Sequence, residues 1–341
     1  MAKIITFGEI MLRLAPEGYL RFVQADTFGA LYGGGEANVA LSLANFGEDA
    51  AFVSRVPKHE IGQAAINSLR RFGVDTQYVA RGGERLGIYF LEKGASQRPS
   101  KVIYDRAHSS IATAAASDFD WAAIFEEADW FHFTGITPAL SDELAAITLE
   151  AVKAAKAAKL TVSCDLNFRK NLWSSEKAGQ VMGQLMPYVD VAIANEEDAD
   201  KVFGIRAANT DVTGGQLSHE AYRDVAAQLC ARFGCRHAAI TLRTSLSASD
   251  NKWAAMLYEN GGDCVFSREY TVHIVDRVGG GDSFGAGLIY ALRTGFPPQE
   301  VIEFATAASC LKHSIEGDAN HVGVAEIQAL CGGDGSGRVQ R

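Results

Sequence analysis

The segment VDRVGGGDSFGAGLIYALRTG, from Val275 to Gly295, joins three consecutive glycines to an apolar helix pattern. Backbone N–H groups in a glycine-rich turn form a concave donor site, and the first turn of a helix adds a partial positive charge. This combination suits an anion, above all a phosphate group. Gly279, Gly280 and Gly281 permit the close approach that side chains would block. We therefore predict that this turn holds a phosphate.

Asp282 directly follows the turn, although a carboxylate repels phosphate. A carboxylate and a phosphate site can lie side by side if Asp282 faces a hydroxyl group that is about to become a phosphate ester. The carboxylate then orients the hydroxyl and accepts its proton while the glycines hold the transferring group. Phosphoryl transfer depends mainly on positioning, so a weak base suffices. The pattern favours this chemistry; the structural alternative is a glycine turn followed by an ordinary helix-capping aspartate.

Dinucleotide binding, the obvious rival for a glycine turn before a helix, fails on spacing. The fingerprint G-x-G-x-x-G, started at Gly279, ends at Phe284 instead of a glycine. The turn also lies near the C-terminus and not after the first strand. No GxxxxGK[ST] motif occurs in the chain, so it is not a P-loop protein.

A second glycine cluster, YGGGEANVALSLANFG, also ends a loop and starts a helix. Glu36 and Asn38 lie near that start. Sugar hydroxyls need donors and acceptors of this kind at close range. A tight turn explains the cluster equally well, so alone it does not decide the function.

These motifs need a scaffold, and strand and helix patterns alternate along the chain. Short apolar runs typical of a buried parallel sheet are separated by amphipathic helix patterns. The expected strands are 3–10, 49–56, 128–135, 160–167, 189–195 and 237–243, and the expected helices are 36–47, 141–159, 174–189 and 219–234. This alternation predicts a doubly wound α/β fold, a mostly parallel sheet with helices on both faces, and ligands at the carboxyl ends of its strands.

Two segments break this alternation, 11–32 and 86–107. The first lacks a helix pattern, and the second reads as two alternating strands around a turn. Together they predict a small antiparallel sheet that serves as a lid; an ordinary hairpin at the sheet edge is the alternative. The predicted organisation is an α/β domain at 1–10, 33–85 and 108–332, a β lid at 11–32 and 86–107, and a flexible tail at 333–341.

Composition narrows the partners. The chain has 341 residues, of which 48% are apolar, and a net charge of −9, which argues against nucleic acid or an anionic membrane surface. No apolar stretch approaches the length of a membrane span. The six cysteines form no CxxC pair, as expected of reduced thiols in the cytoplasm. Any anionic substrate must therefore bind to a few local basic groups.

Both glycine clusters, in this order, resemble the two signatures of the ribokinase-like (PfkB) carbohydrate kinases. GGGEANVALSLANFG is similar to the N-terminal signature, and DRVGGGDSFGAG is similar to the C-terminal one. Arg277 stands where the family usually has Thr or Ser, and Gly280 where it usually has Ala. The resemblance covers nearly the whole chain. It implies ATP and Mg²⁺ as cofactors, Asp282 as the base, the amides of Gly279–Gly281 as the anion hole, and a lid.

Within this family the chain most resembles the 2-keto-3-deoxygluconate kinases, through IYFLEKGASQRPSKVIYDRA, DLNFRKNLW and LKHSIEGDAN. The resemblance implies substrate contacts from Gly33, Gly34, Gly35, Asn38, Tyr89, Tyr104, Arg106, Ile136, Arg169 and Asp318. The residue types agree, because an aromatic on a lid strand can cover a sugar and arginine suits a carboxylate. A surface ion pair is the alternative for each arginine, and a plain turn for Asp318.

The nucleotide side follows from the same resemblance. ANEEDADKVFG is similar to the family's Asn-x-x-Glu motif, which organises Mg²⁺ through water, with Glu197 and Asp198 as indirect metal residues here. ITLRTSLSASDNKWAA occupies the place of the nucleotide loop without its usual glycines. The implied cofactor contacts are Asn167, Arg169, Asn195, Thr241, Arg243, Ser247, Gly279 and Gly281. Helix capping is the alternative for the acidic residues.

The leading hypothesis is an ATP-dependent kinase that phosphorylates the primary hydroxyl of a small sugar acid, with 2-keto-3-deoxygluconate as the first candidate. A fructokinase- or ribokinase-like kinase of a neutral sugar is the second hypothesis, and a sugar-binding sensor without turnover is the third. We also expect a homo-oligomer, because lids of this type in resembling enzymes often pair between subunits.

Overall fold

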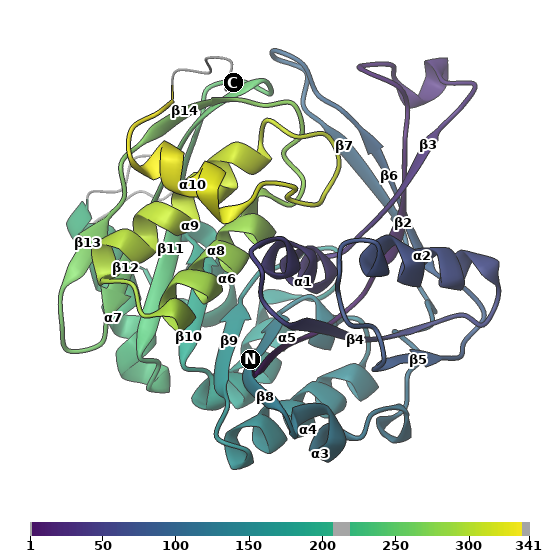
Figure 1. Ribbon diagram of the computed structural model, residues 1–341, viewed down its shortest axis with the longest axis horizontal. Coiled ribbons are helices and arrows are strands. Elements are labelled where there is room, and N and C mark those ends of the chain that lie inside the picture. The colour runs from purple at the N-terminus through teal and green to yellow at the C-terminus, as the bar shows by residue number, and fades with distance from the viewer. Residues whose placement is uncertain (1, 207–218, 336–341) are drawn as a thin grey trace.

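The computed structural model describes residues 2–206 and 219–335, so the end of the expected tail lies outside the described residues. Two sheets organise these residues, a large one in the main body and a small one that stands beside it (Figure 1). Among the helices that the structure describes, none has both the length and the apolar character to cross a membrane.

The large sheet has the strand order β13-β12-β11-β10-β9-β8-β1-β4-β5, and β14 pairs with β12. Its strands are β1 (Lys3–Phe7), β4 (Ala50–Val56), β5 (Val79–Arg81), β8 (Ala128–Thr134), β9 (Thr161–Asp165), β10 (Val191–Asn195), β11 (His237–Ser245), β12 (Asp250–Glu259), β13 (Cys264–Phe266) and β14 (Tyr270–His273). In this spatial order, the seven strands β11-β10-β9-β8-β1-β4-β5 run parallel, and β12 is antiparallel to its neighbours. The predicted α/β class with a mostly parallel sheet is confirmed.

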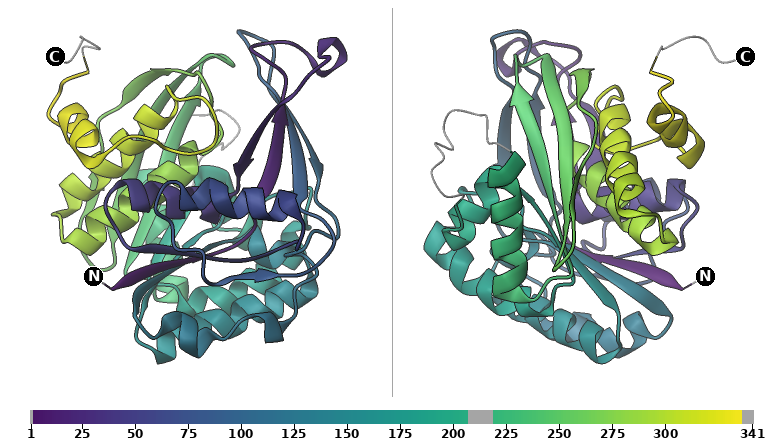
Figure 2. Two further views of the ribbon diagram at one scale, coloured as in Figure 1. Left: turned by 45° about the vertical axis from the view of Figure 1, so that its right-hand side comes forward. Right: turned by 90° about the vertical axis from the view of Figure 1, so that its left-hand side faces the viewer.

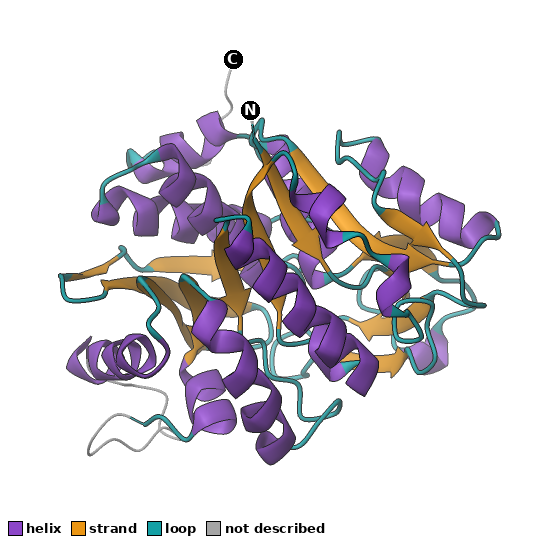
Figure 3. Ribbon diagram, turned by 90° about the horizontal axis from the view of Figure 1, so that it is seen from below, coloured by secondary structure: helices purple, strands orange, loops and turns teal. Residues whose placement is uncertain are grey.

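Helices cover both faces of this sheet, as the right-hand view of Figure 2 and Figure 3 show. The helices are α1 (Gly35–Asn45), α2 (Glu60–Arg70), α3 (Trp121–Phe125), α4 (Asp142–Ala157), α5 (Ser175–Leu185), α6 (Glu196–Phe203), α7 (His219–Phe233), α8 (Gly280–Thr294), α9 (Pro298–Lys312) and α10 (Val324–Cys331). Successive side chains of a strand point to opposite faces. Accordingly, Ile5 and Phe7 pack with the helices α3 to α7, whereas Ile4 packs with α1, α8 and α9.

The small sheet has the order β3-β2-β6-β7. Its strands are β2 (Met11–Ala15), β3 (Gly29–Gly33), β6 (Gly87–Glu92) and β7 (Lys101–Asp105), with a short 3-10 helix at Phe22–Gln24. The two predicted segments do form this sheet, but it is mixed and not antiparallel, because β2 and β6 pair in parallel. Each of these two strands follows a strand of the large sheet, β1 or β5, and both leave the main body in the same direction (Figure 1).

Candidate active site

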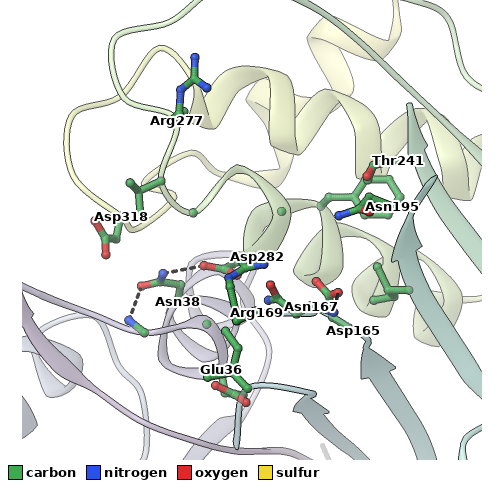
Figure 4. Close-up of a pocket in the computed structure, with 18 of the residues that line it drawn as sticks. Glu36, Asn38, Asp165, Asn167, Arg169, Asn195, Thr241, Arg277, Asp282 and Asp318 are labelled. Atoms are coloured by element: carbon green, nitrogen blue, oxygen red, sulfur yellow. Dashed lines mark hydrogen bonds between the residues drawn. The ribbon is translucent and has the colours of Figure 1, made fainter. Parts of the chain in front are cut away.

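The carboxyl ends of the parallel strands, the first turns of α1 and α8 and the small sheet line one cavity of about 420 Å³. Figure 4 shows part of it. Of the residues predicted from the sequence, the cavity is lined by Gly34, Gly35, Asn38, Tyr89, Tyr104, Arg106, Ile136, Asn167, Arg169, Asn195, Asp198, Thr241, Arg243, Gly279, Gly281, Asp282 and Asp318. Four others are not among its lining residues: Gly33, Glu197, Ser247 and Gly280.

The glycine turn packs closely on two neighbouring residues before it reaches the cavity. Gly279 caps α8 with a left-handed φ of 81°, and a Cβ there would lie 1.8 Å from the carbonyl oxygen of Asp318. A Cβ on Gly280 would lie 2.6 Å from the ring of His313. Gly281 differs, since its Cβ position has no neighbouring described atom within 4 Å. The first two glycines therefore serve packing, and Gly281 faces open space.

An anion at this turn would meet backbone donors. Gly281 and Asp282 are the second and third residues of α8. The first N–H groups of a helix have no acceptor within that helix, and they carry the positive end of its dipole. The cavity beside Gly281 is therefore suited to a phosphate group.

Replacing Gly281 with Ala separates packing from anion binding. Alanine favours a helix over glycine by up to about 1 kcal/mol, so Gly281→Ala should raise the free energy of unfolding. The new methyl group also projects toward the proposed phosphate position, so kcat/KM for ATP should fall about 10-fold. Thermal unfolding measures the expected gain in stability, and steady-state kinetics measure the expected fall in kcat/KM. Gly280→Ala, which forces a methyl group against His313, should lower stability instead. Unchanged kinetics in Gly281→Ala would mean that the turn only redirects the chain.

Asp282 and Asn38 face each other across the first turns of α8 and α1 (Figure 4). Nδ2 of Asn38 donates to Oδ2 of Asp282 over 2.7 Å. Burial raises the pKa of the Asp282 carboxyl to about 6, against the opposing effects of the Asn38 hydrogen bond and the charge of Arg169. A base with a pKa close to the working pH is suited to accept a proton from a substrate.

The glycine cluster at the start of α1 holds Asp282 in place, a role that the sequence did not indicate. Asn38 was predicted to contact the sugar, but its amide is engaged by Asp282 and by the N–H of Gly34, which lies 3.4 Å from Oδ1 of Asn38. A Cβ on Gly34 would lie 1.9 Å from the carbonyl oxygen of Glu9. The cluster thus brings α1 close enough to hold the carboxylate of Asp282.

The acidic motif after β10 is first of all a helix cap. Oδ1 of Asn195 accepts hydrogen bonds from the N–H groups of Glu197 and Asp198, each over 2.9 Å. Asp198 in turn accepts from the N–H of Asn195 over 3.3 Å, which completes a capping box. The structural alternative for this motif is therefore realised. Asn195 and Asp198 still line the cavity, whereas the exposed Glu197 does not.

Asp165, which ends β9, was not predicted from the sequence. Burial and the charges of Asp198 and Asp282 raise the pKa of its carboxyl well above the usual range. Asp165 thus meets like charge from two other carboxylates that line the same cavity. Carboxylate oxygens are the ligands that a magnesium ion prefers, and a cation would relieve this repulsion.

The small sheet contributes two tyrosines to the other end of the cavity, and Arg106, the residue after β7, lies beside them. The rings of Tyr89 and Tyr104 lie 6.0 Å apart, and the Arg106 guanidinium lies 5.4 Å from the Tyr104 ring centre. Arg106 also forms a buried ion pair with Glu9, with Nε 2.8 Å from Oε2. We expected this arginine to await a substrate carboxylate, but it already has an internal partner. Ser109 holds the other oxygen of Glu9 over 2.7 Å.

Arg13 is the main residue that the sequence analysis missed. It lies on β2, is 1% exposed, and donates to the carboxylates of Asp276 and Asp318. The hydroxyl of Tyr89 donates to Asp318 as well. The predicted sugar contact Asp318 is therefore held from two sides. An arginine inside the apolar run MLRLA was the one available signal.

The predicted nucleotide loop is a hairpin. Residues 240–255 lie mainly in β11 and β12, which pair antiparallel around a turn at 246–249. Thr241 and Arg243 lie two residues apart on β11 and line the cavity. The hydroxyl of Ser247 instead bonds within the turn, to Asp250 and to the N–H of Ser249.

Comparisons with known proteins identify the scaffold. The sequence model of the pfkB family carbohydrate kinases matches residues 1–322. A crystal structure of 2-dehydro-3-deoxygluconokinase from Thermotoga maritima is 52% identical, with a TM-score of 0.94, over 97% of this chain and 98% of that one. The 2-dehydro-3-deoxygalactonokinase of Haloferax volcanii is 31% identical over 98% of both chains. The 2-dehydro-3-deoxygluconokinase of Thermoproteus tenax is 28% identical over 93% of this chain and 90% of its own length. The family predicted from the two glycine clusters is thus confirmed, and the chain belongs to the pfkB family of carbohydrate kinases.

Proposed function

We propose that this kinase transfers the γ-phosphoryl group of ATP to the primary hydroxyl of 2-keto-3-deoxygluconate and forms its 6-phosphate. The observation that carries the proposal is Asp282, a carboxyl with a pKa of about 6 in the first turn of α8, next to Gly281, whose Cβ position is open. Proton acceptor and anion site therefore lie within one helical turn.

The reaction divides between these groups. Asp282, oriented by Asn38, accepts the proton of the substrate hydroxyl. The oxygen of that hydroxyl forms a bond to the γ-phosphorus at the same time. The bond between that phosphorus and the oxygen that bridges it to the β-phosphate breaks, and ADP leaves with the electron pair. The N–H groups at Gly281 and Asp282 stabilise the negative charge on the transferring group.

Magnesium fits the acidic wall of the cavity. Mg²⁺ usually keeps several waters and binds one or two carboxylates together with the substrate phosphates. Asp165 and Asp198 would hold it, directly or through water, and Asn195 keeps Asp198 in place. When bound, the ion neutralises charge on the phosphates of ATP.

A sugar acid is favoured by the arginines of the cavity. The chain has a net charge of −9, yet Arg106 and Arg169 both line the site. Arginine binds carboxylates through paired hydrogen bonds. The gluconate-derived substrate is supported by the 52% identity to the Thermotoga maritima enzyme, and the galactonate-derived epimer is the second candidate because of the Haloferax volcanii relative.

An ADP-release assay tests the proposal. Purified protein, ATP and Mg²⁺ are combined in turn with each keto-deoxy acid epimer, fructose and ribose. We expect the highest kcat/KM for 2-keto-3-deoxygluconate. A preference for fructose or ribose would support the neutral-sugar hypothesis, and binding of a sugar without ADP release would support a sensor.

We further propose that the chain forms a homo-oligomer in the cytoplasm. The six cysteines are all unpaired, as in a reducing compartment. Most of the exposed large apolar side chains of the described residues lie in the segments 11–32 and 86–107, which contain the small sheet, including Val23 at 89%, Ile103 at 54% and Phe28 at 39% exposure. Ile103 pairs with Phe90, which packs on Phe28. Contiguous apolar surface of this kind is typical of an interface.

A charge on this surface should separate the subunits. Ile103 alternates with Val102 and Tyr104, which line the cavity, so its side chain lies on the opposite face of the strand. Ile103→Lys should therefore reduce the molar mass measured by light scattering and leave the fold intact. Ile61→Lys places the same charge at an apolar side chain that is 45% exposed on α2, and should not change the mass. A wild-type protein that is monomeric at micromolar concentration would contradict the proposal.

A further inference from the structure

Lys312, the last residue of α9, is fully buried, and the reaction described above does not use it. Its ammonium group donates to two backbone carbonyl oxygens, those of Asp276 and Ile315, each over 3.1 Å. Asp276 lies three residues before Gly279, at the entry to the glycine turn. Ile315 lies three residues before Asp318, the predicted sugar contact. Lys312 therefore joins the two segments that shape both ends of the site.

These segments touch at further points. The N–H groups of Val275 and Asp276 both donate to the carbonyl oxygen of His313, over 2.8 and 3.3 Å. The His313 ring lies against Gly280, and the Asp318 carbonyl lies against Gly279. A shift of residues 313–318 would therefore move the glycine turn with it. The Lys312 ammonium group bonds to both segments and so adds to this coupling.

Burying this charge is costly, and its surroundings offset only part of the cost. Burial lowers the pKa of the Lys312 ammonium to about 8. Asp276, Asp318 and Asp282 oppose that change, and Arg13 adds to it. The carboxylate of Asp276 is already paired with Arg13. A neutral side chain of similar length would avoid this cost but could not donate to both carbonyl oxygens.

We propose that Lys312 is a positioning residue for phosphoryl transfer, whose fixed ammonium holds the glycine turn against residues 313–318 and adds positive potential behind the anion site. The inference rests on the proposed kinase function and extends it to a residue outside the cavity lining. Positive charge close to a site where negative charge develops stabilises the transition state. Because the ligands are carbonyl oxygens, an ammonium or potassium ion can take the same place when the side chain is removed.

Removal and replacement of the cation test this inference. Lys312→Ala should lower kcat at least about 10-fold with a smaller change in KM for the sugar acid. Ammonium chloride or potassium chloride should restore much of this loss, whereas tetramethylammonium chloride at the same ionic strength should not, because that ion is too large. Lys153→Ala, at an exposed lysine of α4, should behave as wild type in every salt. A folded Lys312→Ala protein with wild-type kcat, or one that no cation restores, would overturn the proposal.

The wild-type protein gives a second measurement in case the variant does not fold. The ammonium of Lys312 loses its proton near pH 8 in the folded state and near 10.5 when unfolded. Between these values the unfolded state binds more protons, so this group makes the free energy of unfolding rise with pH. If Lys312 serves catalysis, kcat should fall in the same window. His313, with a pKa lowered to about 4 by burial, stays neutral there.

The two proposals fail in different ways. A kcat that stays level from about pH 7 to about pH 9.5 would contradict the role of Lys312 and leave the kinase function intact. Absence of ADP release by the wild type at every pH would instead contradict the kinase function itself.

Discussion

Asp282→Asn should lower kcat at least about 10²-fold while ATP binding remains close to normal. Asparagine has nearly the same shape and keeps an oxygen that can accept the hydrogen bond from Nδ2 of Asn38. It cannot accept a proton from the substrate hydroxyl. Since burial raises the pKa of the native carboxyl, the ionised group costs stability at neutral pH, and the variant should be at least as stable. Single-turnover kinetics, ATP titration and thermal unfolding measure the three quantities.

The pH dependence gives the same test in the wild type. With a pKa of about 6, Asp282 is protonated and inactive as a base at lower pH, so kcat should fall as the pH drops through 6. Asp142→Asn is the matched control, because Asp142 is also a first-turn aspartate, on α4, but is highly exposed. Near-normal turnover of a folded Asp282→Asn protein would exclude Asp282 as the general base.

Arg106→Ala should reduce kcat/KM for the sugar acid roughly 10- to 150-fold, the equivalent of one charge-assisted hydrogen bond worth about 1.5–3 kcal/mol. The structure adds a second reason. Without the arginine, the buried carboxylate of Glu9 stands unpaired at the cavity and repels an acidic substrate. A neutral ketose carries no charge and should be affected much less. Comparing 2-keto-3-deoxygluconate with fructose, in wild type and variant, measures the difference.

Glu9→Gln distinguishes substrate binding by Arg106 from a purely structural role of its ion pair with Glu9. This change keeps the cation of Arg106 and removes its internal partner, so the preference for the acid should persist. If both variants lose activity equally on both substrates, the ion pair only holds β7 against the main body. That result would favour a neutral-sugar kinase.

Local patterns in the sequence predict much of the fold and of the glycine turn. The glycine turn, the aspartate after it and the alternation of strands and helices depend on neighbouring residues, and each is present in the structure. The hairpin at 240–255 was missed because a family loop was expected where the residues themselves favour strands: Thr, Leu, Trp and alternating polarity.

Partners set by the tertiary fold could not be predicted in this way. Arg13 binds side chains 263 and 305 positions away, and no periodicity of a single strand reports such a distance. Arg106 illustrates the same limit, since the resemblance implied a substrate contact for it but did not reveal Glu9, 97 positions earlier. The contact of Asn38 with Asp282 was not predicted for the same reason, because it spans 244 positions.

The buried triad of Arg13, Asp276 and Asp318 also constrains how this enzyme can evolve. Removing one member of a buried ion pair typically costs about 3–5 kcal/mol, a large share of the stability of a domain. A mutation of Asp318 that adapts the site to a new sugar would therefore be penalised unless Arg13 changes too, although Arg13 lies on β2 and Asp318 in the segment between α9 and α10. Such epistasis favours lineages in which positions 13, 276 and 318 covary. Chimeras that exchange the small sheet between relatives should carry all three residues from the same parent.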